Sequence, residues 1–125
     1  ILMRLPHPLF VLGYGLAMLA VVVLSLMPSP DIPGPEGADK AAHLIAYGTI
    51  TFLGGLGFRS WDTRILAAST AFGIGLFLEF AQAAWFARSG SIWDAASNGI
   101  GAVVGLAAAA IVLQLFIRHV PNPKS

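Results

Sequence analysis

The sequence contains no cysteine and few charged residues. Without cysteine there is no disulfide, no Cys-ligated zinc or iron–sulfur centre and no thiol nucleophile. Charged residues make up only 10% of the 125 residues, whereas soluble domains carry about 25%. Seven Lys and Arg oppose six Asp and Glu, which leaves a net charge of +1. This charge is too small and too dispersed for the basic surface that binds DNA or RNA, so we expect no nucleic acid partner.

The usual catalytic signatures are missing from the sequence as well. It has no HExxH zinc motif, no nucleophile elbow and no glycine loop that would cradle a phosphate. The sequence therefore leaves open whether the chain is an enzyme and which cofactor, if any, it uses.

Hydrophobic residues dominate the amino-acid composition. They make up 57% of the chain, and the mean hydropathy is +0.80. A small domain buries only about 60 to 70% of the surface that its unfolded chain exposes. Hydrophobic surface on this scale excludes a soluble enzyme and predicts a membrane protein whose main partner is the lipid bilayer.

Four stretches have the length and composition of transmembrane helices, which need about 17 to 25 mainly apolar residues. They cover residues 9–27, 41–58, 65–87 and 95–117. Prolines at 28, 30, 33 and 35 end the first stretch. This stretch is longer than the apolar region of a signal peptide and lacks a small-residue cleavage site, so we interpret it as a span. The sequence thus predicts an all-α, polytopic four-transmembrane-helix bundle, formed by residues 1–125 as a single domain.

The distribution of Lys and Arg predicts the orientation. One side of the membrane would hold Arg4, Arg59, Arg64, Arg118 and Lys124, and the other side only Lys40 and Arg88. Because cytoplasmic loops are richer in Lys and Arg, we expect both termini in the cytoplasm, which is an N-in/C-in topology.

Polar side chains of three spans fall near the predicted extracytoplasmic side. Helical spacing puts them on one face of each span, since residues three or four apart share a face. The residues concerned are Asp39, Lys40, His43 and Tyr47, then Glu79 and Gln82, Arg88 in the following loop, and Asp94 and Asn98. Their common depth predicts one outward-facing polar pocket with Glu79 as its deepest acid.

Plainer roles stay open for several of these residues. Asp39 and Asp94 stand where a carboxylate caps a helix N-terminus. His43 and Tyr47 can hydrogen-bond across helices, and Tyr47 can also anchor at the membrane interface. A carboxyl as deep as that of Glu79 predicts a functional or ion-pairing role, with Lys40 or Arg88 as its cationic partner.

The residues of the predicted pocket allow two kinds of chemistry, acid/base catalysis and the binding of a divalent ion. His43 with Glu79 or Asp94 can act as a general acid/base pair, and these groups with Asn98 as a neutral ligand can hold a divalent ion. We place no metal site on the sequence alone.

Small and aromatic residues predict helix packing and interface anchoring. Gly101-Ala-Val-Val-Gly105 is a GxxxG motif, which lets two helix backbones approach closely, either within the chain or in a homodimer. Trp61, Trp85 and Trp93 fall near the ends of predicted spans, where aromatic side chains anchor membrane proteins.

These polar residues together resemble a known family. The series Asp39-Lys40-x-x-His43-x-x-x-Tyr47, Glu79-Phe80-x-Gln82, Arg88 and Asp94-x-x-x-Asn98-x-x-Gly101-x-x-x-Gly105 looks like the VanZ-like family of small bacterial membrane proteins. The resemblance covers about residues 25 to 106 and implies an integral protein of the bacterial cytoplasmic (inner) membrane. The family is named for a teicoplanin-resistance protein of glycopeptide resistance clusters, which implies a link to the cell envelope and to antibiotic resistance.

The first functional hypothesis is a pocket that binds or processes a cell-envelope component, such as a lipid-linked or peptidoglycan-related head group. Lys40 and Arg88 would hold its anionic group, while His43 and Glu79 would transfer protons or orient it. One alternative is a structural or assembly partner in the membrane. Another is a small proton-coupled transporter that uses Glu79, although the first span carries no acid of the kind that small four-span drug exporters have there.

Overall fold

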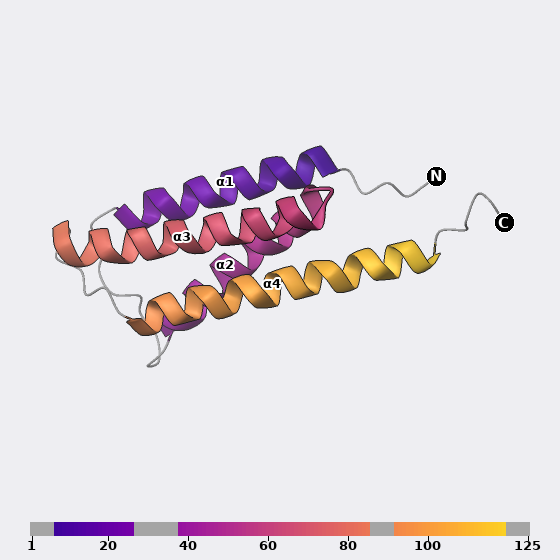
Figure 1. Cartoon of the computed structure of the whole chain (residues 1–125). Coiled ribbons are helices and arrows are strands. Elements are labelled where there is room, and N and C mark those ends of the chain that lie inside the picture. The colour runs from indigo at the N-terminus through magenta and orange to yellow at the C-terminus, as the bar shows by residue number, and fades with distance from the viewer. Residues whose placement is uncertain (1–6, 27–37, 86–91, 120–125) are drawn as a thin grey trace.

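The computed structural model describes residues 7–26, 38–85 and 92–119. They form four α-helices, which are α1 (His7–Leu26), α2 (Ala38–Gly57), α3 (Trp61–Trp85) and α4 (Ile92–His119) (Figure 1). Within these ranges every residue outside the turn at 58–60 is helical. The prediction of an all-α chain is therefore confirmed for the described residues.

Three of the helices are long and apolar enough to cross a membrane. Their apolar stretches are Pro8–Ser25, Trp61–Ala81 and Ala95–Leu115. In α2 the apolar stretch is shorter, Ala41–Gly57, because the helix begins with the polar pair Asp39 and Lys40. Length and composition thus support three of the four predicted spans, while α2 stands at the lower limit of about 17 residues.

The start of α3 differs from the predicted start at residue 65. The Ser60 hydroxyl accepts a hydrogen bond from the Thr63 backbone N–H at 3.2 Å, and the Thr63 hydroxyl accepts one from the Ser60 N–H at 3.3 Å. This reciprocal pair is a capping box with Thr in place of Glu or Gln, and it satisfies two free backbone donors. The capped helix therefore begins at Trp61, which is also the first residue of its apolar stretch.

The chain reverses direction between successive helices, so that α1 and α3 run opposite to α2 and α4 (Figure 1). The end at which α1 and α3 begin carries the turn with Arg59, and we call it the Arg59 end. The opposite end, at which α2 and α4 begin, is called the His43 end. Helix α2 contacts all three other helices and packs most extensively against α4.

Glycines bring α2 and α4 into backbone contact. A Cβ added to Gly101 would collide with the Leu44 carbonyl oxygen, and one added to Gly105 would collide with the Gly48 carbonyl oxygen. The GxxxG motif therefore packs inside the chain. Of the two alternatives that the motif left open, the structure has the contact within the chain, and a homodimer through Gly101 and Gly105 stays a prediction.

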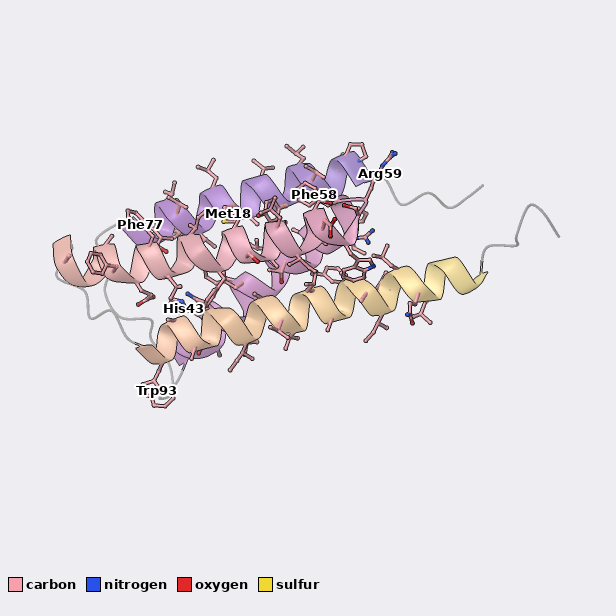
Figure 2. The ribbon with its side chains drawn as sticks, in the orientation of Figure 1. Met18, His43, Phe58, Arg59, Phe77 and Trp93 are labelled. Atoms are coloured by element: carbon pink, nitrogen blue, oxygen red, sulfur yellow. The ribbon has the colours of Figure 1, made fainter. Side chains whose placement is uncertain are left out.

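The side chain of Tyr14 attaches α1 to the other helices. Its hydroxyl donates a hydrogen bond of 2.8 Å to the Ala67 carbonyl of α3. Its ring lies over Gly54 of α2, where an added Cβ would come within 2.9 Å of the ring, and meets Phe58 edge-on. Most of the other large side chains of α1 face outward, as do Phe77 of α3 and Trp93 of α4 (Figure 2). An apolar exterior of this kind fits a lipid environment.

Two glycine substitutions separate close packing from helix propensity. Gly105→Ala should destabilise the fold by about 1–3 kcal/mol, the usual cost of overpacking, because its methyl group meets the α2 backbone. Gly73→Ala, on α3 with no atom within 4 Å of an added Cβ, should stabilise the fold by up to about 1 kcal/mol through helix propensity. Thermal unfolding of both variants in detergent, followed by circular dichroism, checks this. Equal stability of the two would contradict the α2–α4 packing.

Candidate functional site

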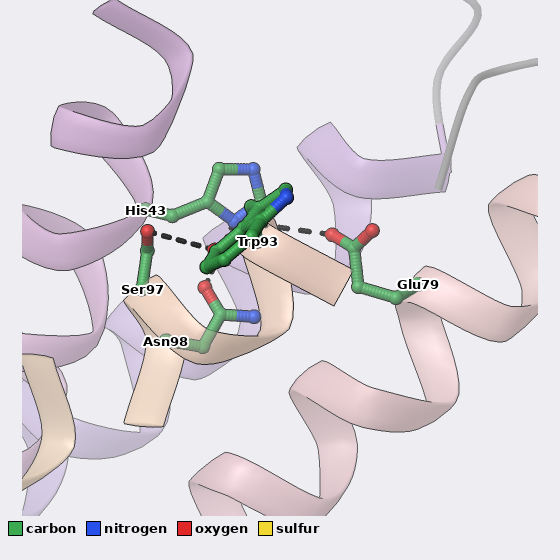
Figure 3. A network of polar contacts seen from close by, with 5 residues as sticks. All are labelled: His43, Glu79, Trp93, Ser97 and Asn98. Atoms are coloured by element: carbon green, nitrogen blue, oxygen red, sulfur yellow. Dashed lines mark hydrogen bonds and ion pairs between the residues drawn. The ribbon is translucent and has the colours of Figure 1, made fainter. Parts of the chain in front are cut away.

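Three helices contribute polar side chains that meet at the His43 end. His43 of α2, Glu79 of α3 and Asn98 of α4 point toward one another (Figure 3). Nδ1 of His43 lies 2.8 Å from Oδ1 of Asn98 and 4.0 Å from Oε1 of Glu79. The structure therefore brings together three of the residues that the sequence placed at a common depth. We call these three residues, together with Tyr47, the polar cluster.

Each side chain of this group is buried to a different degree. Asn98 is only 1% exposed, while the side chains of Glu79 and His43 are 10% and 23% exposed. Burying polar groups in an apolar surrounding is costly unless they are hydrogen-bonded, and the contacts among these residues reduce that cost. His43 is the member most accessible to a ligand.

The hydrogen bond to Asn98 sets the proton position on His43. A carbonyl oxygen can only accept, so Nδ1 of His43 must carry the hydrogen that is donated to Oδ1 of Asn98. In a neutral ring the other nitrogen, Nε2, then has the free lone pair. His43 is thereby oriented to accept a proton at Nε2.

Gly75 of α3 makes room for this arrangement. A Cβ added there would lie 2.9 Å from both Nδ2 of Asn98 and the hydroxyl oxygen of Tyr47. Tyr47 is buried and lies one turn beyond His43 on α2, while Gly75 lies one turn before Glu79 on α3. Sequence reasoning did not single out Gly75, because no local signal separates it from the other 13 of the 14 glycines.

The remaining predicted site residues lie outside the described side chains. Arg88 is outside the described ranges, and only the helical backbone is described for Asp39, Lys40, Gln82 and Asp94. Asp39 and Lys40 stand in the first turn of α2, and Asp94 in that of α4, which places their backbones at the His43 end. An ion pair of Glu79 with Lys40 or Arg88 stays a prediction, whereas the structure shows His43 near that carboxylate.

Metal binding and proton transfer make different demands on the described side chains. Among the side chains that the structure describes, which do not include those of Asp39 and Asp94, no three from His, Asp or Glu gather closely enough to hold a metal ion. What the arrangement offers is a proton acceptor, because Nδ1 of His43 is the donor to Asn98 and the lone pair of the neutral ring is then at Nε2. A histidine oriented through one nitrogen by a fixed acceptor is a common form of general base.

Two of the three tryptophans have described side chains, and these lie at opposite ends of the molecule. Trp61 begins α3 at the Arg59 end and is 47% exposed, and Trp93 lies in the first turn of α4 at the His43 end and is 68% exposed. These positions fit the predicted interface anchors, with the polar cluster inward of Trp93.

No protein-family model, no curated protein and no solved structure matches the chain. The interpretation of the site therefore depends on its own geometry and on the residue pattern.

The orientation of His43 by Asn98 has a spectroscopic consequence. In long-range ¹H–¹⁵N spectra of protein labelled on histidine, neutral His43 should show a protonated Nδ1 and an unprotonated Nε2. Asn98→Leu removes the acceptor and should shift His43 toward a mixture of tautomers. The signal is assigned with His43→Gln, because His7 and His119 also contribute. A wild-type His43 that is protonated at Nε2 alone would contradict the hydrogen bond.

Proposed function

We propose that this chain is a four-span protein of the bacterial cytoplasmic membrane, of the VanZ-like type, whose polar cluster binds the head group of a cell-envelope component. The observation that carries this proposal is the meeting of His43, Glu79 and Asn98, from three largely apolar helices, at one end of the molecule. Ionisable groups at membrane depth are costly, and they usually line a wet cavity or a functional site.

The ligand that we propose carries an anionic group, with Lys40 and Arg88 as its proposed partners, and can exchange protons. His43 and Glu79 supply groups that take up or release a proton, with His43 the more accessible. Two cationic residues are close in sequence to this cluster. Lys40 stands in the first turn of α2, three residues before His43, and Arg88 lies between α3 and α4. A lipid-linked phosphate or a peptidoglycan-related head group has this chemistry. A link to teicoplanin-type resistance, implied by the family resemblance, is part of the proposal.

A structural role is the second candidate, and one observation favours it. Asn98 is almost completely buried, and its 2.8 Å hydrogen bond to His43 joins α4 to α2. A cluster that only locks helices together, or that serves an assembly partner, would have the same bond. The two candidates differ in whether a ligand stabilises the protein through Glu79.

The extracytoplasmic location of the polar cluster follows from the N-in/C-in topology, and single cysteines test it. The chain has no cysteine of its own, so Trp93→Cys and Arg59→Cys each introduce one thiol at an exposed position. In intact cells a membrane-impermeant maleimide should label position 93, and it should label position 59 only after permeabilisation. The reverse pattern would place the cluster in the cytoplasm and overturn this part of the proposal.

Ligand binding is tested by thermal unfolding of the purified protein in detergent with a polyprenyl phosphate, a soluble peptidoglycan fragment or teicoplanin. A ligand that binds only the folded state raises stability by about 2.7 kcal/mol at 100 times its dissociation constant. We expect at least one of these probes to raise the unfolding temperature of the wild type in a dose-dependent way. Glu79→Gln should abolish that shift.

Ser97→Ala is the matched control for Glu79→Gln. Ser97 neighbours Asn98 on α4, but its hydroxyl donates to the Trp93 carbonyl of the same helix, so this variant should keep the ligand response. Loss of stability in Glu79→Gln, without a response to any probe in the wild type, would favour the structural role. Uptake driven by a pH gradient in proteoliposomes, lost in Glu79→Gln, would instead favour the proton-coupled transporter.

A further inference from the structure

Arg64 is a cation inside an apolar stretch, at the end of the molecule opposite the polar cluster. It is half-buried and lies one turn into α3, within the candidate span Trp61–Ala81. A charge at such a position is costly and is usually compensated by a partner. Among the described residues, Arg64 has a carbonyl and an aromatic ring as partners but no carboxylate. Asp62 is two positions earlier, and residues two apart do not face each other on a helix.

Two contacts hold the Arg64 guanidinium in place. Its Nε donates a hydrogen bond of 2.8 Å to the Gly55 carbonyl, in the last turn of α2, where carbonyl groups lack helical partners. Its Cζ lies 4.9 Å from the centroid of the Trp61 ring, which is a cation–π contact. The Nε bond leaves the N–H groups of the two terminal nitrogens for another acceptor, and little side-chain entropy is left to lose on binding.

The surroundings of Arg64 point to the interfacial region of a bilayer. Trp61, on which the guanidinium stacks, is partly exposed, and tryptophan prefers the level of the lipid head groups. Arg59, on the adjoining turn, extends away from the helices at the same end (Figure 2). Of the residues that the structure describes from Phe58 to Arg64, two are arginines and one is an aspartate, all close to Trp61 in sequence.

We propose that Arg64, held by Gly55 and Trp61, binds the phosphate of an anionic phospholipid, with Arg59 as a second cation. A planar guanidinium matches the oxygens of a phosphate with two parallel hydrogen bonds. An anionic head group is preferred to a zwitterionic one, because the latter brings a cation of its own close to both arginines. This lipid site is separate from the polar cluster and does not depend on the function proposed for it.

Thermal unfolding in detergent tests the site with three probes, which are phosphatidylglycerol, phosphatidylcholine and inorganic phosphate. Phosphatidylglycerol should raise the unfolding temperature of the wild type in a dose-dependent way, and the other two should not. Arg64→Gln removes the charge and should lose most of this shift. Arg64→Lys should lose most of it as well, because an ammonium group cannot bond the Gly55 carbonyl and a phosphate in the same geometry. Arg59→Lys keeps the second charge and should retain the shift.

Arg118→Gln, near the end of α4, is the control for loss of any positive charge and should also retain the shift. An equal response to phosphatidylcholine, or an unchanged response in Arg64→Gln, would overturn the proposal. A response to inorganic phosphate alone would mean an anion site without lipid, and would overturn it as well.

A second measurement uses the wild type, so that it does not depend on the folding of any variant. A photoreactive phosphatidylglycerol should form crosslinks that peptide mapping places at residues 59–64. Crosslinks spread evenly over all helix ends would count against the site.

Discussion

The backbone contact between α2 and α4 is the constraint on which the rest of the structure depends. Gly48 on α2 and Gly101 and Gly105 on α4 remove the side chains that would hold the two helices apart. Just beyond this contact, at the His43 end, the same two helices carry His43 and Asn98, whose side-chain atoms meet at 2.8 Å. With larger residues at the glycine positions, the helix axes would separate and this hydrogen bond would be lost. Small residues at a helix crossing thus set the geometry of the polar cluster.

Polar chemistry is divided between the two ends of an apolar molecule. At the His43 end, acidic and neutral groups from three helices face inward and leave His43 partly accessible. At the Arg59 end, Arg64 is held by a helix carbonyl and an indole ring. We propose a different partner for each end, a proton-exchanging head group at the His43 end and an anionic lipid at the Arg59 end. The surface between the two ends is apolar, and it fits the hydrocarbon of a bilayer.

Sequence reasoning predicted the helices well, because apolar length and proline breaks are local properties. It placed the start of the third span at residue 65, whereas α3 begins at Trp61, directly after the first residue of the capping pair of Ser60 and Thr63. It also placed His43, Glu79 and Asn98 at one depth. The direction of each span and a rise of about 1.5 Å per residue determine how far along the helix axis each residue lies. It could not find Gly75 or the attachment of α1 by Tyr14, since both depend on which residue of another helix stands opposite.

The sequence by itself determined that the chain is helical, that it is apolar enough for a membrane and that its polar residues gather near the ends of its helices. These properties follow from composition and from the spacing of residues along single helices. Only the tertiary structure decided the rotation of each helix about its axis and the partner of each polar side chain. It assigned Gly101 and Gly105 to an internal contact, His43 to Asn98 and Arg64 to Gly55. The physical reason is that side-chain pairing and close packing depend on distances between helices, which residue spacing within one helix does not specify.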